Sequence, residues 1–302
     1  MGLLLHDKTE MSLDRPRIMG ILNLTPDSFS DGGQYTHTEQ AVRHGLEMAE
    51  QGADIIDAGG ESTRPGAKRI STDEQIRRVV PVIRALRRRL DERYPAVPIS
   101  IDTTRADVAL AAVEAGATVL NDISAGREDP RMLGLAAERG LPIVLMHMQG
   151  DPGTMQDRPH YTDVVEEVRD FLLERAEAAL SAGVDRRRIV LDPGIGFGKT
   201  AEHNLALLRS VGEFVKTGYP VLIGASRKRF LAGFAGPGGA PDADGQVSLN
   251  KKINDRLGGT CAVTAYGVLA GVKVFRVHDV APNRQAAGLA LALGSPENRP
   301  GE

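Results

Sequence analysis

Eight short apolar runs follow one another along the chain, separated by stretches with a helical hydrophobic period. Within each run the apolar residues are continuous rather than alternating, which is typical of parallel strands buried on both faces. The predicted strands are residues 18–23, 55–60, 99–102, 119–122, 143–147, 189–192, 221–224 and 274–278. The clearest helical stretches are residues 39–51, 73–91, 105–115, 161–182 and 251–271.

Several of the predicted helices end on a glycine that directly precedes the next strand, where glycine supplies a left-handed cap. These glycines are Gly52, Gly116, Gly140 and Gly271. Eightfold repetition of one strand–helix unit predicts an α/β fold, a single (β/α)8 TIM barrel with its active site at the C-terminal ends of the strands. An open, doubly wound sheet is the alternative. We expect an N-terminal extension over 1–16, the barrel over 17–293 and a flexible tail over 294–302, with a Gly/Pro/Asp-rich excursion at 233–248.

Composition agrees with one soluble barrel. The chain has 302 residues, 41% of them hydrophobic and 25% charged, with a formal net charge of -3. This balance predicts neither nucleic-acid binding nor attraction to a membrane surface. No apolar run approaches the roughly 20 residues of a membrane span, and the N-terminal segment lacks the apolar length of a signal peptide, so we expect a cytoplasmic protein. The single cysteine, Cys261, excludes a disulfide framework and a multi-cysteine metal site.

Polar side chains end every predicted strand. They are Asn23, Asp57, Asp102, Asn121 with Asp122, His147, Asp192, Ser226, and Arg276 with His278. A single such residue commonly caps the helix that follows it. Eight strand ends of eight are harder to explain in this way, and in a parallel barrel they converge on one face. We therefore expect them to form the active site.

The chemistry of these residues indicates two kinds of ligand group. The segment 226–229 (Ser-Arg-Lys-Arg) follows the seventh strand, and Arg276 and His278 lie two residues apart on the eighth, which together predict an anion clamp. Asp102, Asn121 and Asp192 predict the complement, a ligand edge rich in N–H donors. Mg²⁺ held partly by substrate phosphates needs few protein oxygens, and Asn23 with nearby aspartates would suffice.

Two other motifs are less persuasive. The segment 194–200 ends like a phosphate-binding P-loop, but Pro193 stands where that motif requires its first glycine. Its glycines are better suited to letting backbone approach a flat ligand. His147 has no second histidine two to four residues further on, which argues against a transition-metal site.

Taken in order, these segments resemble the dihydropteroate synthase family of folate biosynthesis. The most specific are MGILNLTPDSFSDGG (19–33) and DAGGESTRPG (57–66), together with 226–228 and 276–279. Further matches at 100–103, 121–124, 145–150 and 191–199 extend the resemblance over residues 18–280. It implies a transferase that joins (7,8-dihydropterin-6-yl)methyl diphosphate to p-aminobenzoate, giving 7,8-dihydropteroate and pyrophosphate through a pterin-stabilised cation. It also implies Mg²⁺ as cofactor, a homodimer and a sulfonamide target, with small-molecule substrates only.

The resemblance also implies roles for individual residues. Asp102, Asn121, Asp192 and Lys228 would hold the pterin, with Met146 and Phe197 as apolar walls. Thr63, Arg276 and His278 would hold the diphosphate, and Asn23 would bind Mg²⁺. The loops of Phe29, Arg64 and Pro65 would close over the cation and shape the p-aminobenzoate slot. The catalytic set implied is Asp102, Lys228, Phe29, Arg64 and Pro65.

One departure concerns Arg229, because many members carry serine at this position, which helps to receive the p-aminobenzoate carboxylate. Two other functions remain open. One is a methyltetrahydrofolate-dependent methyltransferase, which needs no diphosphate site, and the other is a non-catalytic pterin-binding paralogue.

Overall fold

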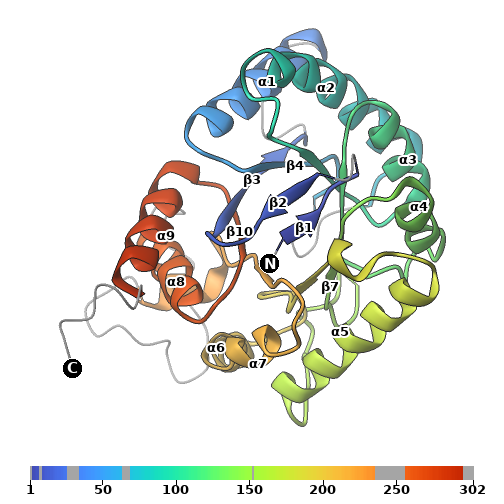
Figure 1. Ribbon diagram of the computed structural model, residues 1–302. Coiled ribbons are helices and arrows are strands. Elements are labelled where there is room, and N and C mark those ends of the chain that lie inside the picture. Colours follow the sequence, from blue (N-terminus) through green and yellow to red (C-terminus); the bar gives the residue numbers. More distant parts are fainter. Residues whose placement is uncertain are drawn as a thin grey trace.

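The computed structural model describes residues 2–6, 9–25, 34–62, 69–151, 153–234 and 256–294. Strands and helices alternate along it (Figure 1). The strands of the main sheet are β3 (Arg17–Asn23), β4 (Ile55–Gly59), β5 (Ile99–Asp102), β6 (Val119–Asp122), β7 (Ile143–Met146), β8 (Ile189–Asp192), β9 (Leu222–Ile223) and β10 (Val274–Val277). The helices around them are α1 (Gln34–Glu50), α2 (Thr72–Arg93), α3 (Ala106–Glu114), α4 (Arg131–Arg139), α5 (Val164–Ser181), α6 (Ala201–Arg209), α7 (Val211–Val215), α8 (Leu257–Leu269) and α9 (Val280–Gly294), with short 3-10 turns η2 (Arg186–Arg188) and η3 (Arg229–Phe234).

The sheet closes on itself. Its eight parallel strands run in the order β8-β7-β6-β5-β4-β3-β10-β9. Leu191 of β8 forms a parallel bridge with Val221 beside β9, and the Leu191 amide donates to the Pro220 carbonyl at 2.9 Å. The two edge strands therefore meet, which confirms the predicted closed barrel and excludes the open sheet. Each of the eight predicted apolar runs coincides with one of these strands, and only β3 extends beyond its run, by one residue at Arg17.

The glycine ends of the helices have the predicted geometry. Gly140 ends α4 in the left-handed region with φ +59°, and Gly116 follows α3 with φ +116°. A side chain is disfavoured at such angles, so glycine lets the chain turn at once into the next strand.

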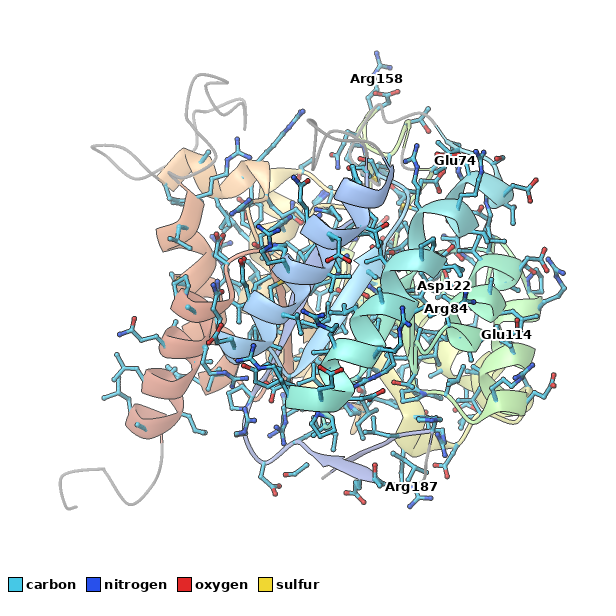
Figure 2. All side chains as sticks on the ribbon, turned by 90° about the horizontal axis from the view of Figure 1, so that it is seen from above. Glu74, Arg84, Glu114, Asp122, Arg158 and Arg187 are labelled. Carbon is cyan, nitrogen blue, oxygen red and sulfur yellow. The ribbon has the colours of Figure 1, made fainter. Side chains whose placement is uncertain are left out.

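An N-terminal hairpin covers the end of the barrel where the strands begin. β1 (Gly2–Leu4) pairs antiparallel with β2 (Glu10–Ser12). Leu3 and Leu13 pack against the layer of side chains that fills the barrel interior at this end. That layer consists of Met19, Ile55, Val144, Val190, Leu222 and Val274. In Figure 2, Arg187 lies beside the hairpin at this end and Arg158, from the segment after β7, lies at the opposite end. With one mouth filled by apolar side chains, the other is left for ligands. Within the described ranges, no helix has the length and apolar character to cross a membrane.

Candidate active site

Strand register places several of the predicted strand-end residues close together, and Asn23, Asp102 and Asn121 share one row. Strand pairing sets Asn23 of β3 beside Gly59, Gly59 beside Asp102, and Asp102 beside Asn121. On the far side, pairing sets Met146 of β7 beside Asp192 of β8. Because register fixes these positions, they do not depend on the loops. Two other predicted strand-end residues turn to loop partners: Asp122 accepts from the Ser124 and Gly126 amides, and His147 lies beside Lys199.

Arg276 of β10 reaches across the barrel to two carboxylates. Its Nε donates to Asp57 Oδ2 at 2.6 Å and its Nη2 to Asp102 Oδ2 at 2.7 Å. Burial alone would lower the pKa of Arg276, but the charges of Asp57 and Asp102 raise it. Asp57 Oδ2 also accepts from the Asn121 amide Nδ2 at 3.0 Å. The sequence placed Asp57 among the strand ends but assigned it no role, because contacts across a barrel leave no local pattern.

Two buried carboxylates and a lysine form the centre of the site. Burial raises the pKa of Asp102 to about 7, against the opposing charge of Arg276, and raises the pKa of Asp192 to about 6. Burial and the charge of Arg276 lower the pKa of Lys228 to about 8, while Asp192 and Asp102 oppose this change. The pKa values of all three groups therefore lie within about one unit of pH 7, and perturbed pKa values of this kind are common in catalytic sites.

The loop after β8 shapes the floor of the site. Asp192 Oδ1 accepts from the Gly194 amide at 2.7 Å. Gly194 has φ +69°, and a Cβ at this position would overlap the carbonyl oxygen of His147. This close approach explains why glycine stands here. The loop then places Phe197, whose ring centroid lies 4.0 Å from Lys228 Nζ, in cation–π contact.

The apolar wall is larger than the sequence predicted. Met146 and Phe197 belong to a cluster of buried side chains that also contains Ile123, Met148 and Met155. Ile123 follows the polar pair that ends β6, and Met148 lies two residues beyond Met146, so both could have been inferred from their distance to a strand end. Met155 comes from the loop after β7 and carries no such signal. These side chains suit the flat face of an aromatic ring.

His278 is held as a neutral hydrogen-bond donor. Its backbone N–H donates to Ser226 Oγ at 3.1 Å, and the same Oγ lies 3.0 Å from His278 Nδ1. Burial, with the charges of Arg227 and Arg276, lowers the pKa of His278 to about 3. In the tautomer in which Ser226 donates to Nδ1, the neutral ring carries its proton on Nε2 and can donate it to an anionic ligand.

One residue of the segment predicted to form an anion clamp has a carboxylate of the protein as its partner. Arg227, in the left-handed region with φ +58°, forms a bidentate pair with Asp279 at 3.0 and 2.6 Å and so joins the turn before η3 to the start of α9. Alternate residues of an irregular turn point in unrelated directions, so spacing alone could not separate Arg227 from Lys228. Arg229 is exposed at the start of η3.

Lys199 confirms that the segment 194–200 is no P-loop. Its ammonium is buried and donates to the carbonyls of Gly194 at 3.0 Å and Phe197 at 2.9 Å, and it lies 2.9 Å from His147 Nδ1. Burial lowers its pKa to about 7. The lysine thus braces the loop that carries Phe197 instead of binding a phosphate.

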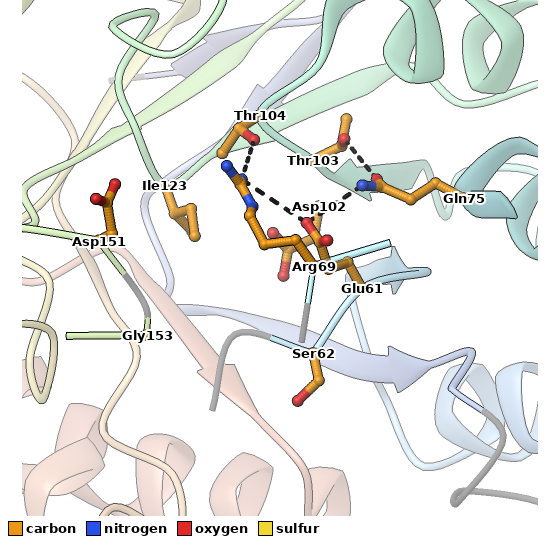
Figure 3. Close-up of a pocket in the computed structure, with 10 residues that line it drawn as sticks. All are labelled: Glu61, Ser62, Arg69, Gln75, Asp102, Thr103, Thr104, Ile123, Asp151 and Gly153. Atoms are coloured by element: carbon orange, nitrogen blue, oxygen red, sulfur yellow. Dashed lines mark hydrogen bonds and ion pairs between the residues drawn. The ribbon is translucent and has the colours of Figure 1, made fainter. Parts of the chain in front are cut away.

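A cavity opens beside Asp102 and Ile123 (Figure 3), with a volume of about 270 Å³. Gln75 links its walls: its amide donates to Glu61 at 3.2 Å and accepts from the Thr103 hydroxyl at 3.1 Å. Arg69 pairs with Glu128 at 2.7 Å on the same side. The remaining lining residues are Ser62, Thr104, Asp151 and Gly153. The cavity extends the pocket from the strand ends towards the loops after β4 and β7.

Four predicted site residues, Phe29, Thr63, Arg64 and Pro65, lie outside the described residues. Asn23 ends β3 at the level of Gly59 and is half-buried. Within the described part of the chain, no group of three or more His, Cys, Asp or Glu side chains could hold a metal ion.

Comparisons with known proteins agree with this geometry. Residues 19–278 match the family of pterin binding enzymes. The dihydropteroate synthase of Mycobacterium leprae is 46% identical over 271 residues, covering 89% of this chain and 90% of the relative. That of Escherichia coli is 41% identical over 292 residues, covering 96% of each.

Solved structures extend the likeness to three dimensions. The dihydropteroate synthase of Xanthomonas albilineans with 4-aminobenzoic acid has a TM-score of 0.84 at 42% identity, covering 99% of this chain and 100% of the other. The Yersinia pestis enzyme in a sulfonamide drug complex also has a TM-score of 0.84, at 39% identity, covering 97% of this chain and 98% of the other. This chain, similar over nearly its full length in both sequence and structure, therefore belongs to the dihydropteroate synthase family of pterin-binding enzymes.

Proposed function

We infer that this chain condenses (7,8-dihydropterin-6-yl)methyl diphosphate with p-aminobenzoate, releasing pyrophosphate and forming 7,8-dihydropteroate for folate biosynthesis. The observation that carries this function is the division of one barrel mouth into two halves. Asp102, Asn121 and Asp192 provide acceptors beside an apolar wall, and Arg276 and His278 provide donors at the end of β10. Relatives of the same fold have been solved with 4-aminobenzoic acid and with 7,8-dihydropteroate.

The residue roles follow from this division and are part of the proposal. Asp102, Asn121 and Asp192 accept hydrogen bonds from the N–H groups of the pterin, and Met146 and Phe197 pack on its ring. As the bond between the methylene carbon and the diphosphate oxygen breaks, its electron pair leaves with pyrophosphate. The fixed carboxylates then stabilise the cation left on the pterin. The p-aminobenzoate nitrogen forms the new C–N bond and loses one proton to solvent.

The leaving group meets hydrogen-bond donors. His278 Nε2 and the Nη groups of Arg276 are expected to donate to diphosphate oxygens, and Thr63 is assigned to the same group. Phe29, Arg64 and Pro65 are assigned to the closure of the site over the cation and to the p-aminobenzoate slot. Localisation in the cytoplasm stays a prediction.

Mg²⁺ belongs to the proposal as cofactor. The donor set fits it, since Asn23 brings one amide oxygen to the level of the strand ends and a diphosphate supplies the further oxygens that Mg²⁺ prefers. Asn23 would hold the ion there. When bound, Mg²⁺ neutralises charge that develops on the leaving diphosphate.

The reaction is tested by incubating the purified protein with Mg²⁺, the pterin diphosphate and p-aminobenzoate. We expect pyrophosphate and dihydropteroate in equal amounts, and loss of both when a chelator removes the divalent cation. Omission of p-aminobenzoate is the control for simple hydrolysis. A folded protein that binds the pterin but releases no pyrophosphate would contradict the assignment and favour the non-catalytic paralogue.

We further propose that the chain forms a homodimer through α8 and α9, which lie side by side in Figure 1. Among the described residues, the large exposed hydrophobic side chains all lie on η3, α8 and α9. They are Phe234, Tyr266, Leu269, Leu289, Leu291 and Leu293, with Leu269 and Leu289 each 60% exposed. An exposed apolar patch on one side of a protein marks an interaction surface.

The dimer is tested with the double variant Leu269→Glu/Leu289→Glu. We expect light scattering to give twice the chain mass for the unaltered protein and a single chain mass for the variant, because burying two added charges disfavours association. Arg84→Glu/Arg88→Glu on α2 is the control, and it should stay dimeric. A monomeric unaltered protein would refute the dimer.

A further inference from the structure

We propose that Asp57 is a positioning residue that fixes the orientation of the Asn121 amide and anchors Arg276, and so joins the pterin half of the site to the diphosphate half. The inference rests on the proposed function and deepens it. Neither group could be placed correctly by its own strand alone, because amides rotate and arginine side chains are long.

Asp57 lies where a single atom can serve both halves. It is the central residue of β4 and only 1% exposed. β6, which carries Asn121, and β10, which carries Arg276, each lie two strands away on opposite sides. Asp57 Oδ2 accepts from Asn121 Nδ2 at 3.0 Å and from Arg276 Nε at 2.6 Å. One oxygen therefore connects three strands.

The first consequence concerns Asn121. A carboxylate paired with a guanidinium accepts hydrogen bonds and has none to give, so the group that Asn121 turns towards Asp57 is its NH₂. The amide is planar, so Oδ1 then points to the other side and acts there as an acceptor. Asp102 and Asp192 are also acceptors. With the amide reversed, this set would present one donor to the N–H edge of a pterin, which would weaken binding.

The second consequence concerns Arg276. Asp57 holds its Nε, and Asp102 takes Nη2 at 2.7 Å. When a pterin N–H group takes the place of Nη2 at Asp102, the Nε bond to Asp57 remains. The guanidinium then stays at the site with its Nη groups turned to the diphosphate. Asp57 thus retains the arginine while Asp102 changes partner.

Asp57→Asn tests both consequences with little change in shape. The amide introduced at this position can donate to Asn121 Oδ1, which permits the reversed orientation, and it carries no charge for Arg276. We expect calorimetry with the pterin alcohol, which lacks the diphosphate, to show affinity weakened about 10-fold. For the diphosphate substrate, KM should rise and kcat/KM should fall about 100-fold, because the buried guanidinium has lost a charged partner.

The double variant Asp57→Asn/Asn121→Asp separates the two roles. It keeps the total charge and restores an amide–carboxylate hydrogen bond with donor and acceptor exchanged, so position 121 again offers an acceptor to the ligand. Affinity for the pterin alcohol should return to within about 3-fold of the unaltered protein. The diphosphate substrate should remain impaired. Because its charge balance is kept, this variant also carries the test if the single variant does not fold.

Asp54→Asn is the matched control. Asp54 is a buried carboxylate bonded to Arg17 and Arg284 at the opposite end of the barrel, so its loss should lower the melting temperature and leave pterin affinity unchanged. Pyrophosphate release by the unaltered protein is measured first, and its failure refutes the proposed function. If release is normal, unchanged binding and turnover in Asp57→Asn would overturn the inference. Equal affinity of the single and double variants for the pterin alcohol would overturn the role in amide orientation.

Discussion

Replacement of Lys228 by alanine is expected to lower kcat/KM by about 10²–10³-fold, or about 3–4 kcal/mol, because it removes one member of a desolvated charged cluster. Lys228 Nζ lies over the face of Phe197, 4.0 Å from the ring centroid. Its charge interacts with both Asp192 and Asp102. Without it, the two buried carboxylates lose a counter-charge and bind protons more readily, so they become poorer acceptors for the pterin N–H groups.

The loss should appear first in binding. Calorimetry with the pterin alcohol measures affinity without turnover, and steady-state release of pyrophosphate measures kcat/KM. Lys273→Ala, directly before β10 at the opposite end of the barrel, is the control and should keep both values. Unchanged activity of Lys228→Ala would remove Lys228 from the site.

The barrel fold and the position of its site at the strand ends could be predicted from the sequence because both depend on patterns between residues close together in the chain. Continuous apolar runs can be buried on both faces, glycines such as Gly140 end helices, and polar residues after each run come together once the strands are parallel. The N-terminal hairpin was expected only as an extension. Its strands, Gly2–Leu4 and Glu10–Ser12, are too short to show a hydrophobic period. Leu3 is a core residue only because it packs on the end of the barrel where the strands begin.

Contacts that depend on distance in the chain could not be predicted. Arg276 and Asp57 are separated by 219 positions, and nothing local to either residue indicates the pair. Arg227 and Lys228 are adjacent, yet one meets Asp279 and the other the active site, because the backbone turns through a left-handed conformation between them. Sequence spacing therefore located the candidate site but could not show which charged side chains form ion pairs with each other.

Asp192→Asn is expected to have the larger effect, a loss of about 10³-fold or more in kcat/KM, because a site built to accept N–H groups strongly rejects a mismatched partner. Asp192 Oδ1 accepts from the Gly194 amide at 2.7 Å. The asparagine oxygen keeps this bond, so the fold of the loop is retained and Nδ2 replaces the other oxygen. The variant then turns a donor towards the donor-rich edge of the pterin and lacks the negative charge that stabilises the cation.

The pH profile separates this chemical role from a packing defect. Burial raises the pKa of Asp192 to about 6 and that of Asp102 to about 7, and the ionised forms are the acceptors. Activity of the unaltered protein should therefore rise as the pH increases through this range. Asp192→Asn should lose the step near pH 6 and keep the one near pH 7. Asp54→Asn should lower stability but keep both steps. Retention of the lower step in Asp192→Asn would show that another group titrates there and that Asp192 does not hold the pterin as an ionised carboxylate.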